Sequence, residues 1–181
     1  MPSVDEARPS HCPACGVASR AVGGKLMLHG HGLRERQCWG PPEVGSSPVA
    51  SSVQARRYLC LGCRAVIIVV PGEVGIRRRY TLSAIAYAMA LYGVARQSVL
   101  LVREQVCVWR IQGVSSSGWI TLKRWIQAIR DGTVWSCVRR CTQISDLRQV
   151  AERAATTVAS CWLGRALPVA AAAWLGAVRA R

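Results

Sequence analysis

The chain is organised around two short cysteine motifs, Cys12-Pro13-Ala14-Cys15 and Cys60-Leu61-Gly62-Cys63. Each is a Cys-x-x-Cys pair, the spacing at which a tight turn directs two thiolates at one tetrahedral metal ion. Two pairs provide four sulfur ligands, which is typical of a closed structural zinc site with no open position for catalysis. The sequence therefore predicts that Cys12, Cys15, Cys60 and Cys63 bind Zn2+ and that the metal holds this region together.

The residues around the two motifs leave alternatives open. Gly16 follows the first pair and allows the positive φ that such a turn needs, whereas Arg64 stands at the matching position of the second. The pairs are further apart than the about 15–20 residues of simple four-cysteine sites, so a segment between them must loop out. Reduced core thiols, or a redox Cys-x-x-Cys, are the alternatives to metal. Cys38 lies between the pairs and is an alternative ligand.

Strand-like sequence flanks both motifs. Residues 25–39, 56–59 and 65–70 have the β-branched or alternating composition of strands, which predicts a three-stranded zinc ribbon over residues 11–75. Residues 40–53 are rich in Pro, Gly and Ser and are expected to form the looped-out insertion. Residues 1–10 are expected to be a disordered lead-in. His29 and His31 fall on one face of the first strand, which is typical of surface or nucleic-acid-contacting histidines, and an H-x-H pair is also a possible metal ligand set.

Helical periodicity begins after the ribbon. Thr81 or Ser83 is a candidate cap for a helix that ends at Gly93, and Ser98 for a second helix to about Val106. A third helix, opened by residues 115–117 and stopped at residues 131–132, has apolar positions spaced i, i+3, i+4, i+7. Residues 76–132 are therefore predicted to form a helix-turn-helix-like domain. The inward positions of its third helix are Leu122, Trp125, Ile126 and Ile129, and the outward ones are Thr121, Lys123, Arg124 and Gln127.

Residues 133–181 are predicted to be C-terminal helices, which makes the whole chain an α+β protein. A helix is expected over residues 145–159, with Ser145 as its cap, and an Ala-rich one over residues 168–179. Trp162 and Trp174 suggest packing or self-association through these helices. The most apolar run, residues 166–178, is shorter than the ~20 residues needed to cross a bilayer, so no membrane span is expected.

The charge balance points to a polyanionic partner. The chain has 24 Lys and Arg against 9 Asp and Glu, a formal net charge of +15. Such an excess is typical of proteins that bind nucleic acid and, less often, an anionic membrane surface. Residues 2–6 lack the apolar stretch of a signal peptide, and the cysteines show no obvious disulfide framework. We therefore expect a cytoplasmic protein in a reducing compartment.

Several segments resemble a known family. They are His11-Cys-Pro-Ala-Cys-Gly16, Leu28-His-Gly-His-Gly-Leu-Arg34, Arg56-Arg-Tyr-Leu-Cys-Leu-Gly-Cys63 and Arg78-Arg-Tyr-Thr-Leu-Ser-Ala-Ile85. These are similar to the N-terminal region of bacterial insertion-sequence transposases and to related zinc-ribbon proteins linked to mobile elements. The resemblance covers about residues 11–130 and implies a zinc ribbon followed by a helix-turn-helix that binds duplex DNA. No acidic triad is found, so it implies DNA binding without strand transfer.

Charge and resemblance together predict the contacts. The Arg side chains before and after the second motif would bind phosphates, and the third helix would enter the major groove. The predicted contact residues are Arg56, Arg57, Arg77, Arg78, Arg79, Thr121, Lys123 and Arg124. An RNA-binding or ribosome-associated ribbon protein is the alternative, with Tyr58, Tyr80 and Trp39 as stacking residues. A third hypothesis is an enzyme that uses His29 and His31 on a catalytic metal.

Overall fold

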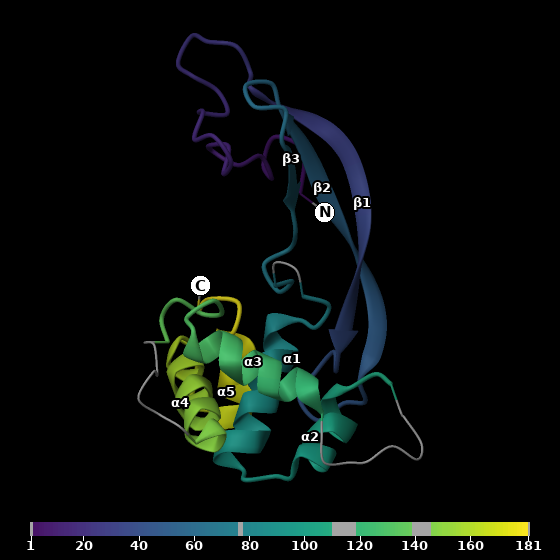
Figure 1. Cartoon of the computed structure of the whole chain (residues 1–181), viewed down its shortest axis with the longest axis vertical. Helices are drawn as coiled ribbons and strands as arrows, with labels where there is room; N and C mark the ends of the chain where they lie inside the picture. Colours follow the sequence, from purple (N-terminus) through teal and green to yellow (C-terminus); the bar gives the residue numbers. More distant parts are fainter. Residues whose placement is uncertain (1, 76–77, 110–118, 139–145, 181) are drawn as a thin grey trace. The chain divides into compact units, whose positions relative to one another are not determined.

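The computed structural model describes residues 2–75, 78–109, 119–138 and 146–180. A three-stranded sheet with the order β1-β2-β3 precedes a set of helices (Figure 1), which confirms the α+β class. The strands are β1 (Leu28–Gly40), β2 (Val49–Cys60) and β3 (Val66–Val69). The helices are α1 (Leu82–Met89), the π-helical turn η1 (Ala90–Val94), α2 (Val99–Val106), α3 (Ile120–Arg130), α4 (Leu147–Ser160) and α5 (Val169–Gly176).

The chain divides into two compact units. Unit 1 consists of Met1–Gln37 and Ser51–Gly72, and unit 2 of Cys38–Ala50 and Glu73–Arg181. The division differs from the expected boundary at residue 75, because the far ends of β1 and β2 belong to the helical unit. There the Trp39 amide donates to the Arg79 carbonyl (2.8 Å), and the Thr81 amide donates to the Trp39 carbonyl (3.1 Å). These bonds join the end of β1 to the segment that leads into α1.

Unit 1 has a very small core. Its fully buried cluster contains Cys12, Leu28, Tyr58, Cys60 and Ile67. The β2 and β3 strands pair in antiparallel fashion, with Arg56 opposite Val69 and Leu59 opposite Val66. Two of the five buried side chains are thiols of the cysteine motifs, so apolar burial alone contributes little to holding this unit together.

The structure corrects the expected loop over residues 40–53. Strand β1 continues to Gly40 and β2 starts at Val49, so only residues 41–48 connect them. The Ser-rich composition indicated a loop because loops and exposed strands select the same polar residues. Residues 49–52 of β2 are all exposed, so no apolar alternation marks them as a strand. These residues nevertheless belong to β2, the neighbour of β1 in the sheet.

The expected disordered lead-in is also corrected. The Tyr58 hydroxyl donates to the Val4 carbonyl (2.6 Å), and the Arg56 Nε donates to the Pro2 carbonyl (2.9 Å). Ser3 and Glu6 close a turn in which the Ser3 amide donates to the Glu6 carboxylate (2.7 Å). The segment before the first motif is therefore held against β2 by the side chains of that strand.

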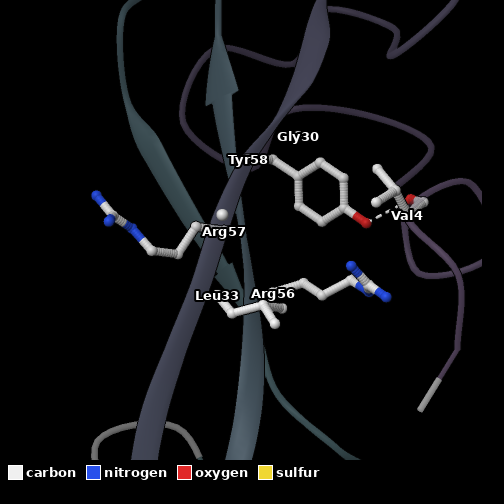
Figure 2. A pocket seen from close by; sticks show the side chains of 7 residues that line it. Val4, Gly30, Leu33, Arg56, Arg57 and Tyr58 are labelled. Atoms are coloured by element: carbon white, nitrogen blue, oxygen red, sulfur yellow. Dashed lines mark hydrogen bonds between the residues drawn. The ribbon is translucent and has the colours of Figure 1, made fainter.

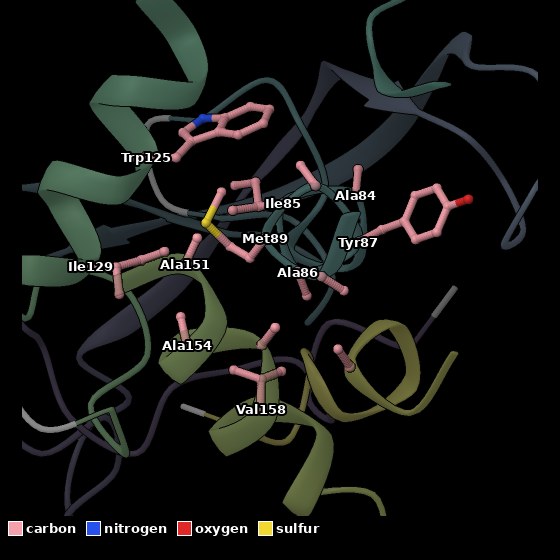
Figure 3. Close-up of a cluster of buried hydrophobic side chains, with 14 of the residues drawn as sticks. Ala84, Ile85, Ala86, Tyr87, Met89, Trp125, Ile129, Ala151, Ala154 and Val158 are labelled. Carbon is pink, nitrogen blue, oxygen red and sulfur yellow. The ribbon is translucent and has the colours of Figure 1, made fainter. Parts of the chain in front are cut away.

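Unit 2 is built around α1, all eight residues of which are buried. Its N-cap is Thr81, whose side chain accepts a bond from the Ala84 amide (3.1 Å), as predicted. Figure 3 shows the side chains of Ile85 and Met89 facing those of Ala151 and Ala154 on α4. Alanines let the helix backbones approach closely. The C-terminal helices predicted as a separate segment thus share one core with the earlier ones.

The ends of the other helices follow local rules, with two corrections. Ser98 caps α2 as predicted, with its side chain accepting a bond from the Leu101 amide (3.3 Å). The cap of α4 is Asp146, whose carboxylate accepts from the Arg148 amide (3.0 Å), instead of the expected Ser145, which lies outside the described residues. The first helix does not stop at Gly93 either, because the π-helical turn runs to Val94.

Helix α3 presents the faces that its periodicity predicts. Leu122, Trp125, Ile126 and Ile129 are buried and pack in the core, while Lys123 and Arg124 are exposed. Residues 115–117, expected to open this helix, lie outside the described residues. Residues 107–119 separate α2 from α3, a longer connection than the three- or four-residue turn of a compact helix-turn-helix. The helix-turn-helix identity is therefore not established by the arrangement of these helices.

Candidate metal centre

The two cysteine motifs form turns of the same design. In the first, the Gly16 amide donates to the Cys12 carbonyl (2.8 Å), and the Cys12 amide donates to the Val17 carbonyl (2.8 Å). In the second, the Arg64 amide donates to the Cys60 carbonyl (2.9 Å), and the Cys60 amide donates to the Ala65 carbonyl (2.9 Å). Each turn needs a residue in the left-handed region immediately after its second cysteine.

Gly16 and Arg64 occupy these left-handed positions, with φ of 73° and 63°. Glycine adopts this conformation without steric cost, whereas a residue with a Cβ pays about 1–2 kcal/mol. The Arg64 turn therefore keeps the same shape as the Gly16 turn at a local cost in backbone strain. A strained residue that persists implies that the surrounding contacts determine the turn.

A short chain of backbone bonds positions one turn against the other. The Ser19 amide donates to the Ser10 carbonyl (2.7 Å), and the Met27 amide donates to the Ser19 carbonyl (2.8 Å). The Leu61 amide, inside the second motif, then donates to the Met27 carbonyl (2.9 Å). The residue that precedes β1 thus links the two motifs.

The four thiols converge on one point. The Sγ atoms of Cys12 and Cys63 are 3.7 Å apart, those of Cys15 and Cys60 are 3.8 Å apart, and all four lie within 4.8 Å of one another. A zinc ion with Zn–S bonds of about 2.3 Å requires tetrahedral S···S edges of about 3.8 Å. The donor set and its spacing fit a four-coordinate metal ion, and Cys12, Cys15, Cys60 and Cys63 form the candidate site.

The site lies at the surface of its unit. Cys12 and Cys60, the first cysteine of each motif, are buried, whereas Cys15 and Cys63 are exposed. All four positions around the central point are filled by thiols from the chain. A metal ion held there would have no open coordination position for a substrate, which is the arrangement of structural sites.

Two of the thiols have opposite pKa shifts. Burial raises the pKa of Cys12, but the backbone amides of Cys15 and Ala14 outweigh it and lower the pKa to about 7. For Cys15 the Val17 amide favours the thiolate, yet burial and the neighbouring thiols together raise its pKa to about 12. The Cys12 thiolate therefore forms readily, whereas the neighbouring thiols disfavour a second thiolate at Cys15. A divalent cation removes this conflict, because it stabilises several thiolates at once.

The alternative ligands do not join this group. Among the described residues, the cluster of possible ligands contains neither Cys38 nor His29 nor His31. The Nε2 atom of His29 is 2.8 Å from the Leu26 carbonyl, so it carries a proton and donates to that oxygen. Both histidines are exposed, and within the described part of the chain they form no group of three potential ligands.

The residues predicted to contact nucleic acid fall in both units. Arg56 and Arg57 lie on β2 in unit 1, and the others that the structure describes belong to unit 2. On α3, Lys123 and Arg124 are exposed and Thr121 is half-buried. Arg77 lies outside the described residues.

The two remaining arginines before α1 have different surroundings. The Arg79 guanidinium stacks on the Trp39 ring, 4.8 Å from its centroid. Arg78 is half-buried, and this burial lowers the pKa of its guanidinium.

No protein-family model matches this chain, and neither a curated protein nor a solved structure matches it. The resemblance to transposases and mobile-element ribbon proteins therefore stays a prediction. Within the described ranges, none of the helices combines the length and apolar character that a bilayer span requires.

Reasoning from the sequence missed several residues that shape the site. Val17 and Ala65 close the two turns, and Met27 connects them. The signal that could have found the first two is the common spacing, since each residue stands five positions after the first cysteine of its motif. Met27 carries no such signal, because it acts through its backbone.

Proposed function

We propose that this protein is a DNA-binding protein whose N-terminal unit is held together by a structural zinc ion. Thiolates are soft ligands, and a tetrahedral set of four is diagnostic of zinc or an iron–sulfur centre among common metals. The zinc assignment is supported by the Sγ distances of 3.7 and 3.8 Å, which fit the geometry of a single ion.

The size of the core supports a metal that is needed for folding. Apart from the two thiols, the buried cluster of unit 1 contains Leu28, Tyr58 and Ile67. Small domains with so few buried apolar groups usually fold with a metal or disulfides. Metal binding then supplies folding free energy directly, as in zinc fingers.

The observation that carries the DNA-binding proposal is the uncompensated positive charge on the exposed face of α3. Lys123 and Arg124 are exposed on the side of this helix opposite Trp125 and Ile129, which are buried. Neither cation has an ion-pair partner among the described residues. Exposed, unpaired cations on one helix face are the usual means of binding phosphates and base edges in the major groove.

The RNA-binding alternative is less favoured by the surroundings of its aromatic residues. Tyr58 and Tyr80 are buried, with 0% and 7% of their surface exposed. Their hydroxyls donate to the Val4 carbonyl and the Cys107 Sγ atom. Trp39 is half-buried and covered by the Arg79 guanidinium. Stacking on single-stranded bases needs open aromatic faces, which these three residues do not offer.

Fluorescence anisotropy with labelled duplex DNA tests the proposal. We expect the zinc-loaded protein to bind duplex DNA, with affinity falling steeply from about 50 to about 200 mM salt. Each lost phosphate contact removes about 0.9 from the logarithmic salt slope, so Lys123→Gln with Arg124→Gln should lower the slope by about two. Competition with single-stranded RNA separates the two nucleic-acid hypotheses.

A matched control removes the same charge elsewhere. Arg153 and Arg165 are exposed on and after α4, so Arg153→Gln with Arg165→Gln keeps the net charge of the α3 variant. This control should retain most of the affinity and the salt slope. Duplex binding that is absent, insensitive to salt or reduced equally by both pairs of substitutions would refute the proposal.

A further inference from the structure

A row of aromatic rings in unit 2 ends in one exposed indole. The rings of Trp119 and Trp125 lie 5.2 Å apart between centroids, and the ring of Tyr80 lies 4.8 Å from that of Trp125. Tyr80 then meets Trp39 at 5.5 Å, and Trp39 meets Trp109 at 6.0 Å, each in an edge-to-face arrangement. The first three rings are buried, Trp39 is half-buried, and Trp109 is 57% exposed. The row therefore runs from the core to the surface.

Trp109 is held in place through both its backbone and its ring. The Cys107 Sγ donates to the Trp109 carbonyl (3.6 Å), and the Tyr80 hydroxyl donates to the same sulfur (3.3 Å). The ring packs against that of Trp39 with the two planes at 82°. Edge-to-face pairs of this kind favour one ring orientation. An exposed indole that is already ordered loses little side-chain freedom when a ligand packs on it.

The other aromatic side chains offer no comparable surface. Among the described residues, Trp109 is the one aromatic side chain that is exposed rather than buried or half-buried. Tyr58 is 0% exposed, and Figure 2 shows its hydroxyl bonded to the Val4 carbonyl. Trp162 is half-buried, and the Arg179 guanidinium lies 5.5 Å from its ring centroid. An accessible indole at the surface is the group on which an unpaired base stacks.

Two cations accompany the exposed end of the row. Arg79 is exposed, and its guanidinium stacks on Trp39, the ring that contacts the indole. Burial raises the pKa of the Tyr80 hydroxyl, and the Arg103 charge opposes that rise, so this guanidinium also lies near the row. Neither arginine has an ion-pair partner in the part of the chain that the structure describes. Helix α2 carries one acid, Glu104, so the two arginines leave a positive balance. Aromatic rings beside cations are typical of surfaces that bind single-stranded nucleic acid.

The same row leads to α3. Trp119 is the N-cap residue of this helix, and Trp125 lies on its buried face, opposite the exposed Lys123 and Arg124. Three ring-to-ring steps, of 6.0, 5.5 and 4.8 Å, separate Trp109 from Trp125. Nucleotides follow one another at about 3.4 Å along a strand of a duplex. A DNA molecule on the exposed face of α3 would therefore have Trp109 within reach of nucleotides a few positions away.

We propose that Trp109 stacks on an unpaired base of the DNA, beside the duplex that α3 binds. The inference rests on the proposed function and names the DNA that it favours, a duplex that continues into unpaired bases. Every base has a π-face, so the contact adds affinity for unpaired DNA without reading its sequence. Arg79 binds a phosphate next to the stacked base.

Two forms of one labelled DNA strand test the proposal. The strand is either paired along its whole length or paired with a shorter complement that leaves an overhang. Stacking of one base on an aromatic side chain is worth about fivefold or more in affinity. We expect the wild type to prefer the overhang form by about that factor, Trp109→Ala to bind both forms equally, and Trp109→Phe to keep most of the preference. Leu163→Ala removes another exposed apolar side chain of unit 2 and should keep the full preference.

A fluorescent base analogue reports the stacking directly. 2-Aminopurine in the overhang should be quenched when the wild type binds, and its fluorescence should stay unchanged when Trp109→Ala binds. The wild-type measurement needs no variant, so it decides the matter even where Trp109→Ala does not fold. Binding of the overhang form without quenching would overturn the proposal.

The remaining outcomes separate the alternatives. Single-stranded RNA should displace the overhang form no better than single-stranded DNA of the same sequence, and tighter displacement by RNA would overturn the DNA assignment. Equal wild-type affinities for the two forms, with Trp109→Ala unchanged, would refute the stacking role alone. Failure of the wild type to bind either form would refute the proposed function itself.

Discussion

Substitution of one buried ligand, Cys60→Ser, should unfold unit 1 and leave unit 2 folded. Cys60 has 0% of its surface exposed, and its Sγ lies 3.8 Å from that of Cys15. Serine is close to cysteine in size, but its hydroxyl does not replace a thiolate ligand in a zinc site. The two units have separate hydrophobic clusters, so loss of the metal should act on one of them.

The magnitude follows from what remains in unit 1 without metal. Leu28, Tyr58 and Ile67 are its buried side chains other than thiols, and at ~2 kcal/mol each they contribute about 6 kcal/mol. Structural zinc contributes apparent free energies of about 10–16 kcal/mol in small domains. The free energy lost with the metal is therefore larger than the contribution of these buried side chains to the stability of unit 1.

Metal analysis, circular dichroism and amide exchange measure this outcome together. We expect the variant to lose equimolar zinc and amide protection over residues 10–37 and 51–72, while the helical circular dichroism stays close to wild type, because the helices lie in unit 2. Cys161→Ser is the matched control, since that half-buried thiol lies outside the cluster and donates to the Thr157 carbonyl. Retention of equimolar zinc and of amide protection in Cys60→Ser would refute the reasoning.

Three further outcomes are expected. Arg64→Gly should stabilise the zinc-loaded unit 1 by about 0.5–1 kcal/mol in a denaturant titration, because it relieves the left-handed φ of 63°, and no stabilisation would argue against strain at this turn. Gly93→Ala should destabilise unit 2 by about 1–3 kcal/mol or prevent its folding, as its Cβ would lie 2.2 Å from the Glu152 amide nitrogen, and an unchanged melting temperature would contradict this packing. Zinc affinity should rise between about pH 7 and about pH 9 with release of protons, because the Cys15 thiol must lose its proton to bind and the neighbouring thiols raise its pKa when the four come together. Calorimetry in buffers of different ionisation enthalpy measures this, and affinity independent of pH would contradict it.

The features predicted correctly from the sequence are those set by local spacing. A Cys-x-x-Cys turn is a local geometry, so the spacing alone predicts that Cys12 and Cys15 point at one ion. Cys60 and Cys63 have the same spacing, and the four thiols together complete one tetrahedral site. The face of α3 followed from the 3.6-residue period, since Leu122 and Trp125 are three residues apart on one side of a helix.

The features that escaped prediction depend on backbone contacts or on partners distant in sequence. The Met27 carbonyl accepts a bond from the second turn, and no side chain marks it in the sequence. The carbonyls of Pro2 and Val4 accept bonds from β2, and almost any residue at those positions could supply the same carbonyl. Tyr58 was expected as a stacking residue, but aromatic character does not distinguish a buried hydrogen-bonded ring from an exposed one. Tertiary context decided these cases.

Strand β1 shows why an exposed polar composition does not identify a loop, because its residues 29–35 are all exposed. An edge strand that is open on both faces would pair with other chains unless charge or irregular backbone discouraged it. Arg34 and Glu35 supply charge on β1, and Gly32, with φ of +87°, breaks the regular strand geometry.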